Sequence, residues 1–276
     1  MKIIKSITEM QHICEKISTN MGFVPTMGYL HEGHLSLVKA AKHRCKKTIV
    51  SIFVNPSQFS PEEDLAEYPR DLQRDTQLLA DLKVDYVFIP ETKAMYPDDY
   101  KTWVEVDEIT RIMCGESRPT HFKGVTTIVS KLLNIINPDF MFMGEKDYQQ
   151  MIVLKQMIKD LNFPVTIIGC PIIREKDGLA KSSRNKYLNA NQRKQALCLY
   201  KSLKLANNLF KQGYRETPYL KEKMVELIKQ NNGKIDYIAF FNPQNLQKVQ
   251  KLNSGDRIAL AVKIGETRLI DNMEVK

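Results

Sequence analysis

The sequence has no long apolar run and few cysteines. None of its apolar stretches approaches the roughly 20 residues that a membrane-spanning helix needs, and the N-terminal MKIIKSITEM lacks the extended apolar segment of a signal peptide. The five cysteines are odd in number, scattered along the chain and without a CxxC pair, a pattern that argues against a disulfide framework and against a zinc knuckle. We therefore expect a cytoplasmic protein with reduced thiols and no membrane segment.

The sequence also has no excess of acidic residues, and the net charge of its 276 residues is +9. From Lys186 to Lys276 there are 17 Lys and Arg but 8 Asp and Glu, whereas the preceding part holds 24 residues of each sign. This asymmetry predicts a compositional boundary near residues 175–186. A basic C-terminal third is typical of a solvated lysine-rich surface, and it also attracts anionic substrates or RNA. Its arginines are not interleaved with aromatic residues, so we expect no nucleic-acid partner.

Short, apolar, β-branched runs alternate with amphipathic helical stretches in the first two thirds of the chain. This alternation predicts a parallel sheet with right-handed crossovers, the Rossmann-like doubly wound α/β layout. In the second helical stretch we expect four leucines to line one side. The predicted strands contain GFVPT, TIVSIFVNP, DYVFIP, DFMFMG and VTIIGCP; the helices contain GHLSLVKAAKHR, EYPRDLQRDTQLLADL, TTIVSKLLNIIN and DYQQMIVLKQMIKDL; and the leucines are Leu72, Leu78, Leu79 and Leu82.

The pattern changes after residue 186. Two polar amphipathic helices are predicted at about 191–211 and 217–231, followed by strands in KIDYIAFF, RIALAVKI and TRLIDNMEV. The GE between the last two strands is typical of a hairpin. We therefore predict a Rossmann-like domain over residues 1–175 and a smaller α+β domain over 176–276, which acts either as a lid or as a rigidly docked unit.

The stretch PTMGYLHEGHLSLV, from Pro25 to Val38, holds two of the five histidines beside glycines. A strand that ends at VPT and a helix that starts near Gly33 place unpaired helical N–H groups at the carboxyl edge of the sheet, where α/β proteins bind anionic ligands. There, His31 and His34 are able to donate hydrogen bonds to phosphate. Two alternatives stay open from these residues alone, namely ordinary surface histidines and a zinc site that lacks matching further ligands.

A second polar cluster lies far downstream, in DGLAKSSRNKYL. It provides cations and hydroxyls in one short loop, a set that suits a polyphosphate. These residues are Lys181, Ser182, Ser183 and Arg184. Together with HxGH, this loop resembles the KMSKS-like signature of the nucleotidylyl-transferase superfamily, which holds the leaving pyrophosphate of ATP.

Further blocks extend the resemblance over essentially the whole chain. PTMGYLHEGH, SIFVNPSQF, EDLAEYPR, RPTHFKGV, GEKDYQQ and REKDGLAKSSRNKYL occur in the order and spacing typical of the pantothenate synthetase (pantoate:β-alanine ligase) family, and the likeness continues weakly to RLIDN. The resemblance implies an ATP-dependent ligase that joins pantoate to β-alanine through a pantoyl adenylate and releases AMP and pyrophosphate. It also implies Mg²⁺ and a homodimer.

The resemblance assigns an ATP site and roles within it. His31 and His34 would hydrogen-bond the phosphates, and we regard His34 as stabilising charge rather than donating a proton. Lys146 and residues 182–184 would hold the β- and γ-phosphates and stabilise the departing pyrophosphate. The residues that would line the ATP site are Met27, Gly28, Tyr29, Leu30, His31, Glu32, Gly33, His34, Gly144, Glu145, Lys146, Asp147, Ile173, Lys181, Ser182, Ser183 and Arg184.

Pantoate is a small branched acid with hydroxyl groups, so its pocket needs amide hydrogen-bonding groups among apolar side chains. Gln58 and Gln150 match the two glutamines of the family. Asp75 is our candidate for a carboxylate near Mg²⁺, and an ordinary helix-surface aspartate is the alternative. Weaker candidates for the substrate pocket are Asn55, Tyr68 and Arg118.

Two positions depart from the commonest family pattern. Lys181 stands where methionine or leucine is frequent, which adds a cation beside ATP, and Thr120 stands where glycine is frequent. Three other function classes stay open: a nucleotidylyl transferase that leaves the nucleotide on its product, an RNA-binding protein of synthetase-like ancestry, and a nucleotide sensor without catalysis. The first shares the ATP signatures but has no need for paired glutamines that face a small acid.

Overall fold

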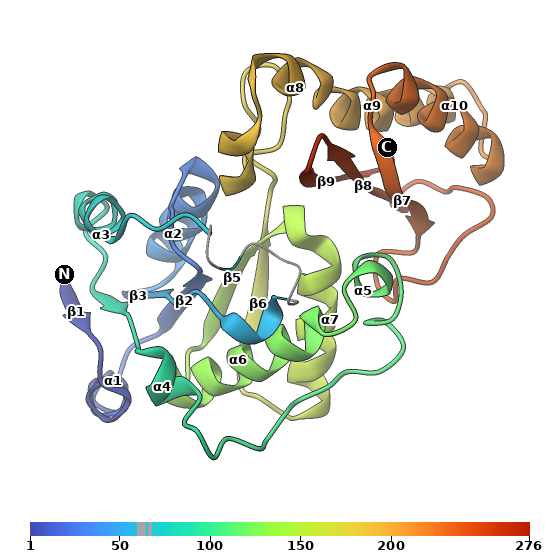
Figure 1. Ribbon diagram of the computed structural model, residues 1–276. Helices are drawn as coiled ribbons and strands as arrows, with labels where there is room; N and C mark the ends of the chain where they lie inside the picture. The colour runs from blue at the N-terminus through green and yellow to red at the C-terminus, as the bar shows by residue number, and fades with distance from the viewer. Residues whose placement is uncertain (60–64, 66–67) are drawn as a thin grey trace.

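The computed structural model describes residues 1–59, 65 and 68–276, and its strands form two sheets (Figure 1). The larger sheet has six parallel strands in the order β1-β4-β3-β2-β5-β6, which confirms the doubly wound α/β prediction. Its strands are β1 (Lys2–Ile4), β2 (Met21–Thr26), β3 (Lys47–Ile52), β4 (Tyr86–Phe88), β5 (Phe140–Gly144) and β6 (Thr166–Cys170).

The strand order of this sheet reverses at β2. β2 pairs with β3 on one side and with β5 on the other, although β5 follows β2 by more than a hundred residues in the chain. The connections that leave the carboxyl ends of β2 and β5 therefore diverge, and they open a crevice at this edge of the sheet. Strand β2 is almost wholly buried because helices cover both faces of the sheet.

Seven helices of the described chain accompany the parallel sheet. Val38 of α2 and Leu79 of α3 belong to one buried apolar cluster, whereas Met10 of α1, Leu132 of α6 and Leu154 of α7 belong to another. In the described ranges, no helix combines the length and the apolarity of a bilayer span. The helices are α1 (Ile7–Glu15), α2 (Glu32–Arg44), α3 (Leu72–Asp81), α4 (Thr92–Met95), α5 (Cys114–Ser117), α6 (His121–Ile136) and α7 (Tyr148–Asp160).

One predicted helix face is partly wrong. Leu79 is fully buried, and Leu78 and Leu82 pack against its cluster, but Leu72 is 46% exposed. Leu72 is the first residue of α3, where the chain has just entered the helix and has not yet reached the sheet. In the EDLAEYPR block, positions 63, 64, 66 and 67 lie outside the described residues.

The C-terminal part forms a second, antiparallel sheet with helices on one face. The predicted hairpin is confirmed, since two adjacent strands pair along their whole length around Gly265 and Glu266. The single helix expected at 191–211 is instead two helices, because the chain turns at Ala196 and Leu197. The elements are α8 (Ala190–Gln195), α9 (Cys198–Lys211), α10 (Thr217–Gln230), β7 (Lys234–Phe241), β8 (Arg257–Ile264) and β9 (Thr267–Glu274).

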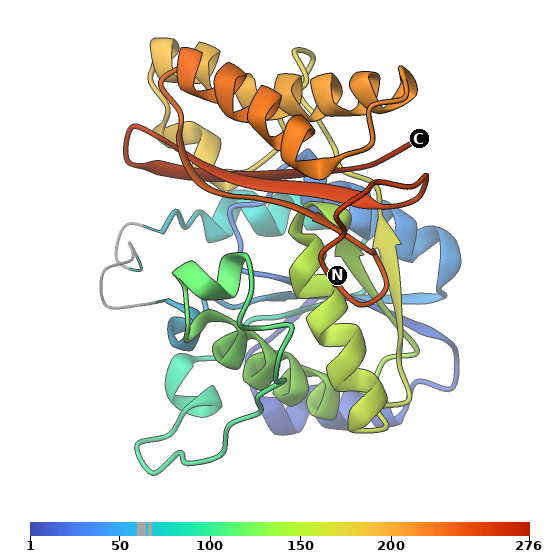
Figure 2. The same ribbon diagram turned by 90° about the vertical axis from the view of Figure 1, so that its right-hand side faces the viewer.

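The antiparallel sheet lies between its own helices and the parallel sheet, as Figure 2 shows from the side. Leu203 of α9 and Met224 of α10 pack under one face of it. Phe241 and Ala259 join the cluster that contains α6 and α7, so the C-terminal part also packs on the parallel-sheet half. The division at residue 175 falls between β6 and the helices of this part, and it stays a prediction.

Candidate active site

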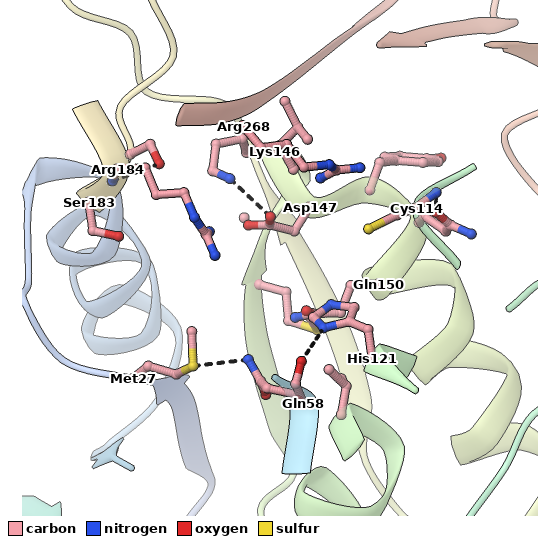
Figure 3. Close-up of a pocket in the computed structure, with 18 of the residues that line it drawn as sticks. Met27, Gln58, Cys114, His121, Lys146, Asp147, Gln150, Ser183, Arg184 and Arg268 are labelled. Carbon is pink, nitrogen blue, oxygen red and sulfur yellow. Dashed lines mark hydrogen bonds and ion pairs between the residues drawn. The ribbon is translucent and has the colours of Figure 1, made fainter. Parts of the chain in front are cut away.

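A cavity of about 1060 Å³ lies where the carboxyl ends of β2, β3, β5 and β6 face the antiparallel sheet. This volume suffices for a nucleotide together with a small acid. Three short 3₁₀ turns supply lining residues: η1 (Pro56–Gln58), η2 (Glu145–Asp147) and η3 (Ser183–Tyr187). Figure 3 shows Arg184 and Lys146 at one part of the cavity and Gln58 with Met27 at another. Segments far apart in the sequence therefore share one site.

The two histidines of the HxGH stretch form the N-terminal cap of α2. His31 is the N-cap residue and its Nδ1 accepts a hydrogen bond from the Gly33 N–H at 3.1 Å, while His34 Nδ1 accepts from the His31 N–H at 3.3 Å. This is a capping box in which imidazoles replace the usual Ser and Glu. The spacing of three residues is therefore what a reciprocal cap requires, and it holds the two rings 4.1 Å apart.

Both imidazoles are neutral at physiological pH. Burial is the main reason that the pKa falls from an ordinary 6.5 to about 4 for His31 and to about 3 for His34, and nearby positive charge lowers both values further. Because Nδ1 of each ring accepts a backbone N–H, a neutral ring carries its proton on Nε2. Each histidine therefore offers one N–H donor beyond the helix cap, and both side chains line the cavity.

Glycines allow the HxGH loop to take this shape. A Cβ on Gly33 would lie 2.8 Å from Cε1 of His31, so the ring folds over a position that no side chain can occupy. Gly28 has φ +84°, in the left-handed region. A Cβ there would approach Asp75 Oδ2 at 3.1 Å. Gly33 thus leaves room for the His31 ring, and Gly28 allows the turn of the backbone.

Asp75 holds the same loop from α3. Its Oδ2 accepts from the Tyr29 N–H at 2.6 Å and its Oδ1 from the Leu30 N–H at 2.7 Å. The residue is 1% exposed and lies outside the cavity lining. Burial raises its pKa, and the two backbone N–H groups oppose this shift. These surroundings differ from those expected of a Mg²⁺ ligand, because both carboxylate oxygens are turned to the backbone.

Lys146 stands on the turn that links β5 to α7. Its Nζ is 2.9 Å from Asp147 Oδ1, and both side chains line the cavity (Figure 3). Burial raises the pKa of Asp147, but the charges of Lys146 and Arg184 outweigh it, so the net pKa is below its ordinary value. Asn272 of β9 supports the turn, since its Nδ2 donates to the carbonyls of Glu145 and Lys146 at 2.8 and 3.0 Å.

The KSSR loop follows β6 in the chain, and its residues also line the cavity. Ser182 Oγ accepts from the Arg184 N–H at 3.3 Å and caps η3. Lys181 Nζ lies 3.0 Å from Glu32 Oε2 at the start of α2, so the extra cation predicted beside ATP is paired with a carboxylate. Lys186 Nζ lies 4.6 Å from the centre of the Tyr29 ring. The two predicted ATP motifs therefore contact each other directly.

Most of the predicted ATP residues line the cavity, and five do not. Gly28, Tyr29 and Leu30 shape the loop behind His31, and Leu30 is 1% exposed in an apolar cluster. Glu32 faces Lys181, and Glu145 faces Arg257 at 3.2 Å. Those that line the cavity are Met27, His31, Gly33, His34, Gly144, Lys146, Asp147, Ile173, Lys181, Ser182, Ser183 and Arg184.

The five predicted substrate residues also line the cavity, but they differ in position. Gln58 donates from Nε2 to Met27 Sδ at 2.9 Å, and its Oε1 accepts from Asn55 Nδ2 at 3.1 Å. Asn55 is 1% exposed and also donates to the Gly124 carbonyl. Asn55 therefore helps to orient Gln58. Tyr68 packs edge-on against Phe59, and Gln150 lies on the first turn of α7.

The RPTHFKGV block holds the turn that carries Gln58. Arg118 Nη2 donates to the Gln58 carbonyl at 3.3 Å, and His121 Nδ1 is 3.1 Å from the same oxygen. Gly124 of α6 lies so close to this turn that a Cβ would be 2.3 Å from the Ser57 carbonyl oxygen. The block thus sets the position of η1.

Several lining residues escaped the sequence reasoning, among them Cys114, Tyr237 and Arg268. Asn272, which holds the Lys146 turn, escaped it as well. Arg268 and Asn272 are the residues at either end of RLIDN, the block whose weak likeness to the family was the available signal. Their strand is remote in sequence from the parallel sheet, so periodicity alone gives no reason to place them at the cavity.

The described residues offer no group of three or more His, Cys, Asp or Glu side chains placed to hold a metal ion. Within that part of the chain, the two histidines have no third side chain of these types placed to complete a metal site with them. The absence of such a group from the described residues is compatible with Mg²⁺ bound mainly by phosphate oxygens, which is how this ion is commonly held in nucleotide enzymes.

Comparisons with known proteins agree over the full chain. The family model described as pantoate-beta-alanine ligase matches residues 2–274. Pantothenate synthetases from Caldicellulosiruptor saccharolyticus and Pseudothermotoga lettingae are 54% and 50% identical, over 100% and 99% of this chain and 100% and 98% of theirs.

Solved structures show the same likeness. The crystal structure of pantothenate synthetase from Thermus thermophilus is similar with a TM-score of 0.95 and 40% identity, over 100% of this chain and 99% of that one. A pantoate-beta-alanine ligase from Francisella tularensis, complexed with beta-gamma ATP and β-alanine, gives a TM-score of 0.84 and 41% identity, over 99% and 97% of the two chains.

Proposed function

The chain belongs to the pantoate–β-alanine ligase family, and from this premise we propose that it activates pantoate as a pantoyl adenylate before joining it to β-alanine. The chain is an ATP-dependent ligase that forms pantothenate. The alternative, a transferase that leaves the nucleotide on its product, receives no support from these relatives.

One observation carries the adenylate proposal: the phosphate-binding groups and the amide groups line the same cavity. His34, Lys146 and Arg184 lie on three different elements that converge there, and Gln58 and Gln150 lie in the same space (Figure 3). An acid held by the glutamines and a triphosphate held by the cations would therefore occupy the same cavity. Such juxtaposition is the main requirement of a phosphoryl-transfer step.

In the first step a carboxylate oxygen of pantoate attacks the α-phosphorus of ATP. A bond forms between that oxygen and the phosphorus, and the bond from the α-phosphorus to the bridging oxygen breaks, so the electron pair leaves on pyrophosphate. The Nε2–H groups of His31 and His34 donate to phosphate oxygens as charge shifts toward the leaving group. Lys146, Ser182, Ser183 and Arg184 hold the β- and γ-phosphates.

The neutral state of the two histidines supports hydrogen bonding rather than acid catalysis. A ring whose pKa is about 3 or 4 has almost no imidazolium form near neutral pH. Pyrophosphate leaves as an anion, and its charge is compensated by the cations of the cavity. We therefore assign the histidines to electrostatic stabilisation and to holding the phosphates.

We propose that Mg²⁺ arrives with ATP as the MgATP complex. The absence of a multi-carboxylate cluster among the described residues fits this assignment, because the phosphate oxygens then supply most of the ligands. Asp147 is a carboxylate in the cavity lining beside Lys146. When bound, the ion neutralises phosphate charge.

In the second step the neutral amine of β-alanine attacks the acyl carbon of the adenylate. A C–N bond forms, the bond from the acyl carbon to the phosphate oxygen breaks, AMP departs with the electron pair, and an amine proton passes to solvent. The mixed anhydride must be kept from water until then. We propose that residues 176–276 act as the cover, since β7 and β9 contribute one wall of the cavity.

The test of the proposed function is exchange of labelled pyrophosphate into ATP with β-alanine omitted. Reversible formation of a pantoyl adenylate requires that exchange occur with pantoate and stop without it. Exchange that is independent of pantoate, or a stable nucleotidylated product, would contradict the proposal. The variants Lys146→Ala and His34→Ala should slow adenylate formation in single turnovers by roughly 100-fold or more, with circular dichroism unchanged.

We also propose a cytoplasmic location and a homodimer. The five cysteines are free thiols in the structure, which suits a reducing compartment. Trp103 is 45% exposed beside Tyr96, an apolar surface of the kind that subunits cover. Sedimentation equilibrium measures the number of subunits directly.

A further inference from the structure

The amine substrate brings a second carboxylate that takes no part in the chemistry. The carboxylate of pantoate becomes part of the anhydride, but that of β-alanine stays ionised throughout and needs a partner in a site that excludes water. The cations near the phosphates already have tasks, because Lys146 pairs with Asp147 and Lys181 pairs with Glu32. A different cation must therefore receive this carboxylate.

Arg268, at the start of β9, lines the cavity and is held by one edge of its guanidinium. Nε and Nη2 donate to Asp236 Oδ2 at 2.9 and 2.7 Å, and Ser117 Oγ donates to the same oxygen at 3.1 Å. Nη1 makes no hydrogen bond with the residues that the structure describes. The side chain is 19% exposed. The arginine is thus preorganised, with one N–H₂ group available for a ligand.

Tyr237 adds a neutral donor beside it. Its ring lies 5.9 Å from the guanidinium carbon of Arg268, and it also lines the cavity. Within the described part of the chain, no hydrogen bond involves its hydroxyl. Burial raises its pKa, so the hydroxyl keeps its proton. An arginine and a phenol side by side form a usual pair of donors for a carboxylate.

Two lysines continue from Arg268 across the antiparallel sheet. Lys263 of β8 is directly opposite Arg268 in register, and Lys234 of β7 is directly opposite Lys263. All three line the cavity, and both lysines are exposed. Like charges that face one another across strands destabilise a sheet, so the placement of Lys263 opposite both Lys234 and Arg268 does not itself stabilise the fold. It does raise the local concentration of small anions at the cavity.

We propose that Arg268, with Tyr237 beside it and Lys263 and Lys234 leading to it, forms the subsite for the carboxylate of β-alanine. The inference rests on the proposed function, since it names where the second substrate of that reaction binds. Figure 3 shows Arg268 on the side of the cavity away from Gln58 and Met27. The two acids would thus bind at different walls, with the amine directed toward the acyl group between them.

Three measurements on Arg268→Gln test the subsite. With β-alanine omitted, pantoate-dependent exchange of pyrophosphate should change by no more than about 3-fold, since no β-alanine is bound in that step. In the full reaction the KM for β-alanine should rise by roughly 10–100-fold, the usual effect of losing a charge-assisted bond. The preference for β-alanine over β-alaninamide, which has the same amine but an uncharged carboxamide in place of the carboxylate, should fall by the same factor. Arg268→Lys, which keeps the charge, should recover part of that preference.

The controls separate binding from support of the fold. Arg111→Gln removes an exposed arginine that also pairs with an aspartate, Asp107, at 2.8 Å but lies outside the cavity, and it should leave the KM for β-alanine unchanged. Ser117→Ala removes the link from α5 to Asp236 while keeping Arg268. Two results would show that Arg268 only supports the fold, and either would overturn the inference. One is an equal rise in the KM for β-alanine in Ser117→Ala. The other is an equal rise in the KM for β-alaninamide in Arg268→Gln.

The failure of this inference is distinct from failure of the proposed function. If wild-type protein shows no pantoate-dependent exchange, the ligase mechanism itself is wrong. If exchange is normal but Arg268→Gln keeps the wild-type KM for β-alanine, the mechanism stands and the subsite is elsewhere. A raised KM with Arg118→Gln and a normal one with Arg268→Gln would assign the carboxylate to Arg118.

Discussion

At the scale of single residues, the HxGH histidines use one ring nitrogen for the helix cap and keep the other for the phosphate contact that we propose. Nδ1 of each ring closes the cap of α2, and Nε2 remains for a ligand. The hydrogen bond from a backbone N–H to Nδ1 therefore fixes the orientation of each ring and with it the direction of its Nε2–H. A serine or a glutamate would cap the helix as well, but neither would present an N–H donor to a phosphate.

This arrangement predicts an unusual pH dependence. Because the pKa values of His31 and His34 are about 4 and 3, neither ring should titrate between pH 5 and 8. The ratio kcat/KM for ATP in pantoate-dependent exchange, which reports the ionisations of the free enzyme, should therefore show no ionisation near 6.5 that depends on these residues. ¹⁵N NMR of the imidazoles should show the Nε2–H tautomer down to pH 5. A pH–rate profile with an ionisation near 6.5 that disappears in His34→Gln would instead indicate that His34 acts as a protonated general acid.

The same shifts affect folding stability with a definite sign. Below pH 6.5 the unfolded chain binds protons at these histidines while the folded chain does not, so the free energy of unfolding falls as the pH falls. The fall extends from about 6.5 down to the folded values of about 4 and 3. In urea titrations between pH 7 and 4.5, His31→Gln should lose less stability than wild-type protein over this range. An equal loss in both proteins would mean that His31 is protonated when folded.

Asp75 allows the metal hypothesis and the loop-holding hypothesis to be separated. In Asp75→Asn an amide N–H₂ group would face one of the backbone N–H groups of Tyr29 and Leu30 that the carboxylate now accepts. We expect the KM for ATP to rise by roughly 10-fold or more, with the Mg²⁺ concentration for half-maximal rate unchanged at saturating ATP. Asp81→Asn, on the exposed end of α3, is the control. A raised Mg²⁺ requirement with normal ATP affinity would restore the metal role.

At the scale of elements, the site is carried by three 3₁₀ turns that follow strands. The sequence predicted the strands β3 and β5 and placed Gln58 and Lys146 just beyond them, because parallel strands gather their carboxyl ends at one edge. It did not predict what fixes each turn. Gln58 depends on Asn55, three positions away, and on Arg118 and His121 of the RPTHF segment, which are about 60 positions away and beyond the reach of local patterns.

Some helix boundaries carry a local signal in the sequence and others do not. Ser6 accepts a hydrogen bond from the Glu9 N–H and caps α1, and SITE is a capping-box sequence. The turn at Ala196 and Leu197 contains no glycine or proline that would predict it. Ala196 is fully buried in the core of the C-terminal part, a tertiary contact that local sequence does not reveal. The fold class and part of the cavity lining were thus predictable from periodicity and resemblance, whereas the lining residues of β9 and the supporting contacts were not.

The close approach of α6 to η1 gives an element-scale prediction. Alanine normally stabilises a helix interior relative to glycine by about 1 kcal/mol. In Gly124→Ala, however, the Cβ would lie 2.3 Å from the Ser57 carbonyl oxygen and 2.6 Å from the Gln58 nitrogen. We expect stability to fall by about 1–3 kcal/mol in denaturant unfolding, and the KM for pantoate to rise as Gln58 shifts.

Gly144→Ala is the matched control for this prediction. A Cβ on Gly144 meets no heavy atom within 4 Å, and its φ of −76° suits any residue. Its free energy of unfolding should therefore equal that of wild-type protein. If Gly144 lines the ATP site as proposed, its KM for ATP should rise instead. Equal effects of the two variants on stability would contradict the steric argument.

At the scale of the whole molecule, the C-terminal part contributes to the site from a distance in sequence. Its excess positive charge is not spread evenly, since Lys234, Lys263 and Arg268 form one row that lines the cavity. Its last strand also contacts the turn that carries Lys146, through Asn272. Both features follow from strand register and sheet docking, which the sequence alone did not locate. The two sheets therefore build one site together.

Asn272 tests this dependence between the two halves. It is 2% exposed, its amide donates to two carbonyls of the Lys146 turn, and Arg257 Nη1 donates to its Oδ1 at 2.6 Å, which fixes the direction of the amide. In Asn272→Ala the turn loses both donors, and displacement of Lys146 by about 1 Å would slow adenylate formation by roughly 100-fold. Asn272→Asp should be no better, because a carboxylate cannot donate to the carbonyls.

Rapid-quench measurement of pantoyl adenylate in single turnovers reports this step without the second one. The KM for β-alanine in the Asn272 variants should stay close to that of wild-type protein, because Arg268 lies at the other end of β9 from the turn. Asn253→Ala, at an exposed turn, serves as the control. If Asn272→Ala formed the adenylate at the wild-type rate while losing stability, Asn272 would only join the two sheets. A slow step in a protein of wild-type melting temperature would show that the last strand of one sheet sets the geometry of the turn on the other.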